Sequence, residues 1–169
     1  SFRMGMKIEN ITIKLGENHR RLNGIRLLHI SDLHLSGRNR KIEKYIEQLA
    51  EIECDLIMVT GDLIDHDSGI EWCAEYLGML SSTYGMWAIL GNHDKYRHNF
   101  FRKFSRTKKK IVPALNNTEL LRATLLKNDI RLLIDESSQI SINSTPIRVI
   151  GSDVYWGTGD YRADIFTNR

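Results

Sequence analysis

Three short groups of metal-binding side chains stand out in the sequence, and each one follows an apolar stretch. The first group pairs Asp32 with His34 directly after residues 25–30. Side chains two residues apart on an extended segment point the same way, so this carboxylate and this imidazole can share one cation. The same arrangement recurs twice further along the chain. Those later groups are Asp62 and Asp65, followed by Asn92, His93 and Asp94.

The middle and last groups supply what a pair of metal ions needs. Two divalent ions about 3.5–4 Å apart can bind both sides of a phosphoryl group and activate a water molecule. Such a pair requires a bridging carboxylate, for which Asp62 is the natural candidate. Asp32 and His34 would serve one ion, and the amide oxygen of Asn92 would serve the other. This mixture of oxygen and nitrogen donors fits Mn, Fe or Zn and does not choose among them.

His93 lies next to Asn92 and has two possible roles. It could act as a general acid towards the leaving oxygen, or it could hold a phosphate oxygen. An imidazolium needs a carboxylate to orient it, and Asp65 is the best placed. Asp65 and Asp94 are each either a site residue, a helix cap or a turn residue.

The elements that must position these groups alternate between strands and helices. Strands are predicted at residues 25–30, 55–60 and 84–90. The continuous apolar character of the first is typical of a parallel strand covered on both faces. His29, inside the first strand, is accordingly expected to be a hydrogen-bonded core residue. Helices are predicted between the strands. Their apolar faces are Ile42, Tyr45, Ile46 and Leu49 in the first, and Ile70, Cys73, Ala74 and Leu77 in the second.

A βαβαβ order predicts an α/β fold with a parallel sheet, in which ligands bind beyond the carboxyl ends of the strands. Elsewhere, residues 7–15 alternate as a half-buried strand, and residues 68–71 indicate a capping box. Residues 117–128 predict another helix. Short strands follow at 131–134, 139–142 and 147–150, the last two joined through residues 143–146 as a hairpin.

Composition sets only broad limits. The chain has 169 residues, of which 41% are hydrophobic, enough for one domain with a core. Its net charge of +3 does not indicate a particular class of binding partner. Two cysteines fit a reducing compartment, and no stretch has the length of a membrane span or a signal peptide. A cytoplasmic location is expected, with or without association with a membrane.

The three groups, in this order and at these intervals, resemble the calcineurin-like metallophosphoesterase family. That family carries D-x-H, G-D-x-x-D and G-N-H-[DE] at successive strand ends. The similarity covers residues 25–94 and continues more loosely to a Gly-x-Asp step at 151–153. It implies a β-sandwich flanked by helices and a hydrolase with two metal ions. The roles that it implies agree with those above: Asp32, His34, Asp62 and Asn92 as ligands, and His93 with Asp65 in catalysis.

The chain departs from the family pattern in one respect. Family members complete the site with later histidines, whereas no histidine follows His98 here. Residues 1–169 are therefore expected to form a single metallophosphoesterase domain that is incomplete at its carboxyl end. The alternative to an enzyme is a catalytically inactive member of the family that serves as a binding or scaffold module.

The substrate is expected to be a phosphodiester, a pyrophosphate or a phosphomonoester. Phenylalanines interleave with lysines and arginines between residues 100 and 110, either as a solvated basic helix or as a flap that contacts lipid or steers phosphate. The second interpretation favours a lipid-linked substrate and peripheral membrane contact. Some similar enzymes are UDP-2,3-diacylglucosamine pyrophosphatases, which makes that compound a hypothesis for the substrate. No nucleic-acid partner is expected, because no such binding motif is present.

Overall fold

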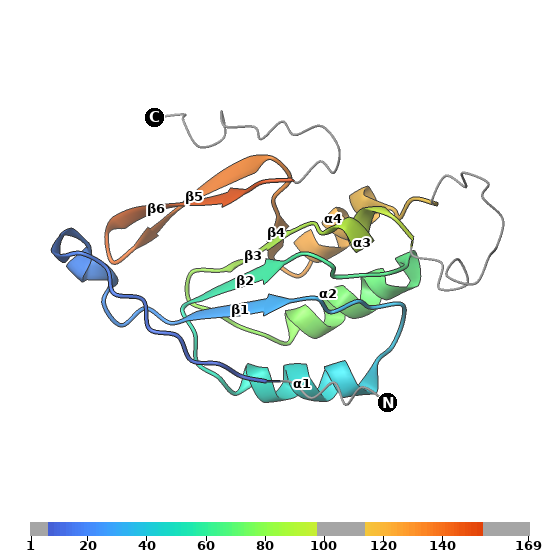
Figure 1. Ribbon diagram of the computed structural model, residues 1–169, viewed down its shortest axis with the longest axis horizontal. Helices are drawn as coiled ribbons and strands as arrows, with labels where there is room; N and C mark the ends of the chain where they lie inside the picture. Colours follow the sequence, from blue (N-terminus) through green and yellow to red (C-terminus); the bar gives the residue numbers. More distant parts are fainter. Residues whose placement is uncertain (1–6, 98–113, 154–169) are drawn as a thin grey trace, which may run out of the picture.

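A computed structural model describes residues 7–97 and 114–153 (Figure 1). Its centre is a parallel sheet whose four strands follow one another in chain order, β1-β2-β3-β4. The α/β prediction with a parallel sheet is confirmed, and so are the positions of its strands. The strands are β1 (Leu27–Ser31), β2 (Leu56–Thr60), β3 (Met86–Ile89) and β4 (Ile130–Leu132).

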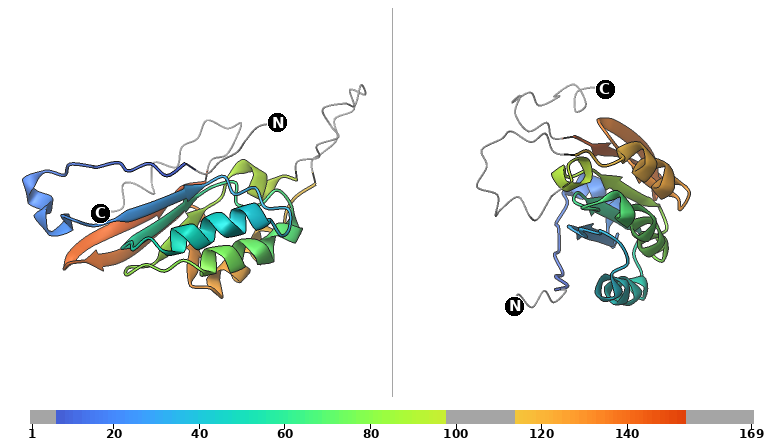
Figure 2. Two further views of the ribbon diagram at one scale, coloured as in Figure 1. Left: turned by 90° about the horizontal axis from the view of Figure 1, so that it is seen from below. Right: turned by 90° about the vertical axis from the view of Figure 1, so that its right-hand side faces the viewer.

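Three helices cover one face of this sheet (Figure 2). They are α1 (Arg40–Ala50), α2 (Ile70–Gly78) and α4 (Thr118–Leu126). Shorter helical turns accompany them, namely η1 (Glu17–Leu22), η2 (Asp67–Gly69) and α3 (Asn92–Lys95). The two helices predicted from the apolar faces Ile42 to Leu49 and Ile70 to Leu77, and the helix predicted at 117–128, are therefore confirmed.

Asparagine side chains cap the amino-terminal ends of two of the helices. The Asn39 side chain accepts hydrogen bonds from the backbone N–H groups of Lys41 and Ile42, at 3.1 and 3.3 Å. The Asn117 side chain accepts one from Leu120 N–H at 2.9 Å. An N-cap of this kind satisfies N–H groups that have no partner within the helix.

The capping box predicted at residues 68–71 is wrong. Gly69 precedes α2 and has no capping side chain, while the Ser68 hydroxyl donates to the carbonyl of Ser36 at 2.7 Å. A β-carbon at position 69 would lie 2.0 Å from the carbonyl oxygen of Leu35. The start of α2 is thus set by its close approach to the loop after β1, which requires a glycine.

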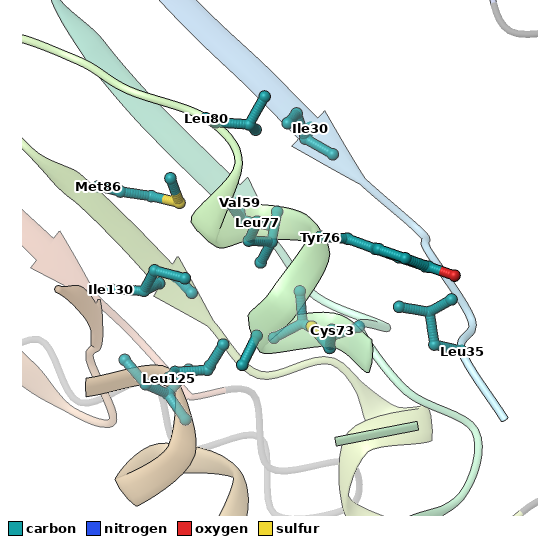
Figure 3. Packing of buried hydrophobic residues seen from close by; sticks show 14 of the residues in the cluster. Ile30, Leu35, Val59, Cys73, Tyr76, Leu77, Leu80, Met86, Leu125 and Ile130 are labelled. Carbon is teal, nitrogen blue, oxygen red and sulfur yellow. The ribbon is translucent and has the colours of Figure 1, made fainter. Parts of the chain in front are cut away.

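The main core lies between the sheet and the helices. Tyr76 and Leu77 of α2 pack towards Ile30 and Val59 of the sheet, as Figure 3 shows. All four side chains are buried. The Tyr76 hydroxyl also accepts a hydrogen bond from the backbone N–H of Asn39 at 2.9 Å, which ties α2 to the start of α1.

An antiparallel hairpin packs on the opposite face of the sheet. It consists of β5 (Glu136–Ile142) and β6 (Thr145–Gly151), and Val149 contributes to a second buried cluster with Leu56, Trp87 and Leu133. The predicted hairpin is confirmed with a shorter connection. Asn143 and Ser144 alone form the turn, both at positive φ, which is typical of two-residue hairpin loops.

The hairpin leaves the outer face of β1 open in the described part of the chain. Leu27 is 52% exposed and His29 is exposed, with its Nε2 2.6 Å from the Thr60 hydroxyl. Two predictions are therefore wrong for the described residues: these cover β1 on one face only, and His29 is not in the core. The apolar run alone could not show this, because burial of the second face depends on another layer.

The strand predicted at residues 7–15 is also wrong. This segment has no strand pairing, and its apolar side chains are largely exposed, including Ile11 at 79% and Ile13 at 78%. Alternation indicates which face a strand would bury but does not provide a partner strand. The basic and aromatic stretch at 100–110 lies outside the described residues, and so does His98. No helix in the described ranges is long and apolar enough to cross a membrane.

Candidate metal and catalytic site

The loops after β1 and β2 continue the parallel pairing beyond the strands. The backbone N–H of His34 donates to the carbonyl of Asp62 at 2.9 Å, and that of Leu35 donates to Leu63 at 3.0 Å. In return, the Asp65 N–H donates to the carbonyl of Leu35 at 3.0 Å. The first and second groups of candidate residues are therefore held side by side by main-chain hydrogen bonds.

Carboxylates attach the third loop to the second. Oδ1 of Asp62 accepts a hydrogen bond from the backbone N–H of His93 at 3.0 Å. The two oxygens of Asp94 accept from the backbone N–H groups of Ile64 and Gly91, both at 2.8 Å. These contacts bring the three groups to the same edge of the sheet.

Asp94 is a structural residue. Its side chain is fully buried, and both of its oxygens are occupied by backbone N–H groups. Burial raises the pKa of Asp94 to about 6, although the two backbone hydrogen bonds oppose this shift. Of the alternatives that the sequence left open, the structure favours the cap, since Asp94 accepts from the residue before α3.

Three of the candidate ligands have an unusual backbone conformation. Asp32, His34 and Asp62 have φ values of 58°, 48° and 53°. Non-glycine residues rarely occupy this left-handed region, and they do so chiefly at functional sites and turns. The conformation turns the chain sharply where the strands end, so that side chains from two loops face a common space.

The side chains in that space lie at distances suited to ligands of one ion. Nε2 of His34 is 3.8 Å from Oδ1 of Asp32 and 3.9 Å from Oδ2 of Asp62. Donor atoms of His34, Asp62 and His93 all lie within 4.8 Å of one another. These separations are too long for hydrogen bonds and short enough for shared coordination. A set of carboxylate oxygens and imidazole nitrogens suits a divalent transition metal, so these residues fit such an ion.

Asp65 connects two of the histidines. Its Oδ1 lies 2.9 Å from Nδ1 of His34 and 2.6 Å from Nδ1 of His93. A carboxylate only accepts, so both Nδ1 atoms donate and both Nε2 atoms remain for other partners. Burial raises the pKa of Asp65, but the hydrogen bonds from the two histidines outweigh it and hold the pKa below its usual value.

The contact between Asp65 and His34 could not be found from the sequence. The pairing of Asp65 with His93 was predicted, whereas nothing in the spacing indicates that one oxygen serves both rings. The rings themselves lie edge to face, with centroids 4.6 Å apart at an interplanar angle of 77°. The two histidines are thus fixed by one carboxylate and by each other.

The remaining predicted residues lie around this cluster. Asp32 is 63% exposed in its side chain and accepts a hydrogen bond from the Ser31 hydroxyl. Asn92 is the first residue of α3, immediately before His93. His66 is an exposed loop residue, and its Nδ1 accepts from the backbone N–H of Ser68 at 3.2 Å. One buried residue beside the cluster was missed altogether, namely Asn116.

The sequence also matches a known family over most of its length. The profile of the calcineurin-like phosphoesterase family covers residues 25–158. The chain belongs to this family. The predicted family and its α/β fold class are thereby confirmed.

Individual relatives add detail. An uncharacterised metallophosphoesterase of Bacillus subtilis, YkoQ, is 28% identical over 153 residues, which is 89% of this chain and 51% of that protein. The UDP-2,3-diacylglucosamine pyrophosphatase LpxG of Chlamydia trachomatis is 26% identical over 122 residues, 70% of this chain and 36% of the enzyme. The chain therefore spans about half or less of the length of these relatives.

A solved structure also resembles this chain. The phosphopantetheinyl hydrolase PptH of Mycobacterium tuberculosis gives a TM-score of 0.49 at 16% sequence identity. The alignment covers 82% of this chain and 48% of the hydrolase.

Proposed function

We propose that this chain carries metal ligands and the general acid of a phosphoesterase site, and that the protein hydrolyses a phosphodiester, a pyrophosphate or a phosphomonoester. One observation carries the proposal above all. Nε2 of His34 and Oδ2 of Asp62 lie 3.9 Å apart at the carboxyl edge of the sheet, and a ring nitrogen of His93, the proposed acid, lies within 4.8 Å of donor atoms of both residues. Asp32 lies beside them, with Oδ1 3.8 Å from His34 Nε2.

The residues divide into ligands and catalytic groups. Asp32 and His34 would hold one divalent ion, Asn92 would hold a second, and the Asp62 carboxylate would serve both. When bound, such ions neutralise charge on the phosphoryl group and lower the pKa of a coordinated water molecule. Mn, Fe and Zn all suit the donor set. His34 is held ready for this role because Asp65 occupies its Nδ1 and leaves Nε2 for the ion.

His93 is the proposed general acid. In the hydrolysis, the oxygen of a water molecule adds to phosphorus, and the bond between phosphorus and the leaving oxygen breaks. The leaving oxygen takes a proton from Nε2 of the His93 imidazolium. The proton lost by the attacking water passes to bulk solvent, from which His93 is protonated again. Asp65 stabilises the charged imidazolium through the hydrogen bond to its Nδ1. This fits a carboxyl group whose pKa lies below its usual value.

A lipid-linked substrate is the most specific form of the proposal. Its support is the named activity of the Chlamydia trachomatis relative, a UDP-2,3-diacylglucosamine pyrophosphatase, together with the basic and aromatic composition of residues 100–110. Peripheral contact with a membrane from the cytoplasmic side would give the enzyme access to such a substrate.

The test is the hydrolysis of a chromogenic phosphodiester by the 169-residue chain with Mn²⁺, compared with the same reaction in chelator and with Asp62→Asn. Activity that requires both the metal and Asp62 is the expected result. A folded chain that binds Mn²⁺ with normal stoichiometry after Asp62→Asn would remove Asp62 from the bridging role. A folded wild-type chain that binds metal and hydrolyses nothing is what a scaffold member of the family would show.

A further inference from the structure

Asn116 is a buried residue beside the site and forms hydrogen bonds with several of the residues around it. It is only 7% exposed. Its side-chain Nδ2 donates to the backbone carbonyl of His93 at 2.9 Å and, at 3.4 Å, to that of Asp65. Its backbone N–H donates to the carbonyl of Lys95 at 3.0 Å. One amide therefore joins the main chains of the two residues that form the Asp65–His93 hydrogen bond.

Asparagine is well suited to this position. A side-chain amide has two donor hydrogens and an acceptor oxygen, and all of them are used here. The oxygen accepts a hydrogen bond from Nε of Arg97 at 3.2 Å. An aspartate of the same shape would present only acceptors to the carbonyls of His93 and Asp65. Buried oxygens facing one another without a hydrogen between them are unfavourable.

Charged residues hold Asn116 in place from the outer side. Arg97 forms an ion pair with Asp67, whose other oxygen accepts the backbone N–H of Asn117 at 2.7 Å. The backbone N–H of Arg97 also donates to the carbonyl of Ala114 at 2.8 Å. The segment around Asn116 is thus fastened both to the loop after β2 and to the end of α3.

We propose that Asn116 is a positioning residue for the Asp65–His93 pair. By bonding both main chains, its amide fixes how closely the loop after β2 approaches α3, and so it sets the 2.6 Å separation between Oδ1 of Asp65 and Nδ1 of His93. The inference rests on the proposed function only in the role that it gives to His93. In the described part of the chain, Asn116 forms no hydrogen bond with His34, which leaves the His34 hydrogen bond to Asp65 as an internal reference.

The experiment compares Asn116→Asp with a matched control, Asn128→Asp. Asn128 also donates its side-chain amide to a backbone carbonyl, that of Thr124 at 3.3 Å, but at the far end of α4. Nitrogen-15 NMR of the histidine rings, in metal-free protein with chelator, reports which ring nitrogen of each histidine carries the proton. Steady-state kinetics with Mn²⁺ accompany it.

In Asn116→Asp, we expect His93 to lose its uniform Nδ1–H state while His34 keeps it. The value of kcat should fall by about 10-fold or more, because small displacements of a catalytic group are costly, and KM should stay within about 2-fold. Asn128→Asp should match the wild type in both measurements. A purely structural role would disturb the two histidines alike, which would overturn the inference.

Asn116→Ser serves if Asn116→Asp does not fold. Serine is neutral and keeps one donor, so the same selective change at His93 is expected in weaker form. A folded variant of either kind with an unchanged His93 ring signal overturns the positioning role, whatever the activity. Absence of hydrolysis by the wild type would count against the proposed function instead, and the NMR comparison would still decide the role of Asn116.

Discussion

Gly91 lies directly against Asp62. A β-carbon at position 91 would stand 2.1 Å from Oδ1 of the Asp62 carboxylate and 2.4 Å from the Asp62 backbone nitrogen. The φ of Gly91 is −102°, which any residue can adopt. Glycine is therefore required here for space and not for backbone freedom. The loop that carries Asn92 and His93 can approach the Asp62 carboxylate only because position 91 has no side chain.

Although it adds only one methyl group, Gly91→Ala should strongly reduce both metal binding and stability. The methyl group must displace the Asp62 carboxylate or the third loop, so we expect Mn²⁺ affinity to fall by about 10-fold or more. Stability should also fall, by about 1–3 kcal/mol, as in other overpacked interiors. Isothermal titration with Mn²⁺ and urea denaturation measure the two effects. Gly16→Ala is the matched control, because nothing lies within 4 Å of a β-carbon there; equal effects of the two substitutions would refute the steric argument.

The two histidines that share Asp65 should separate into a ligand and an acid. His93→Ala should keep its metal and lose turnover by about 10²-fold or more, the usual contribution of a general acid. His34→Ala should instead lose metal affinity, because its Nε2 faces Asp32 and Asp62. Metal content by atomic absorption and kcat at saturating Mn²⁺ distinguish them.

Asp65→Ala checks this division. It removes the acceptor for the Nδ1 atoms of both histidines, so it should lower both the metal affinity and the turnover. If His93→Ala lost its metal and His34→Ala kept it, His93 would be the ligand and His34 the acid.

The parts of the fold that could be predicted from the sequence are those that depend on chain-local patterns. Apolar runs that end in Asp32, Asp62 and Asn92 are enough to place the three groups together, because parallel strands end at a common edge. The pairing that continues through His34 and Leu35 then follows from the same register. Nothing beyond strand order is needed for this part of the site.

The errors arose where a partner from elsewhere decides the outcome. Residues 7–15 alternate correctly for a strand, but no strand pairs with them in the described structure. His29 sits in an apolar run, yet its face of β1 has no covering layer among these residues. Asn116 was missed for a related reason, since its contacts to Asp65 and His93 span 51 and 23 residues and leave no local signature.

Lys108, Lys109 and Lys110 should matter for a lipid-linked substrate alone. Replacing all three by alanine removes positive charge that would attract an anionic membrane surface, worth about 1 kcal/mol per residue near the surface. We expect kcat/KM to fall on a pyrophosphate lipid presented in anionic vesicles and to stay unchanged on a soluble chromogenic diester. Salt should reduce the difference between wild type and variant. A loss of equal size on both substrates would show damage to folding and would remove the case for membrane contact.

Asp94 should make the stability of the protein fall between about pH 4 and pH 6. In the unfolded chain its carboxyl ionises at the ordinary pKa of 3.8, whereas burial raises the pKa to about 6 in the folded protein. The folded state therefore binds more protons than the unfolded state within this window. Its free energy of unfolding decreases as the pH rises through it, by about 3 kcal/mol from this group.

The comparison with Asp94→Asn isolates that contribution, because the other carboxyl groups are common to both proteins. Asparagine cannot accept from both Ile64 and Gly91, so the variant should be the less stable protein at pH 4. The difference in the free energy of unfolding, measured by urea denaturation in chelator, should shrink as the pH rises to 6 and level off above it. A difference that stays constant from pH 4 to pH 7 would mean that Asp94 ionises normally, and that its two backbone hydrogen bonds fully compensate its burial.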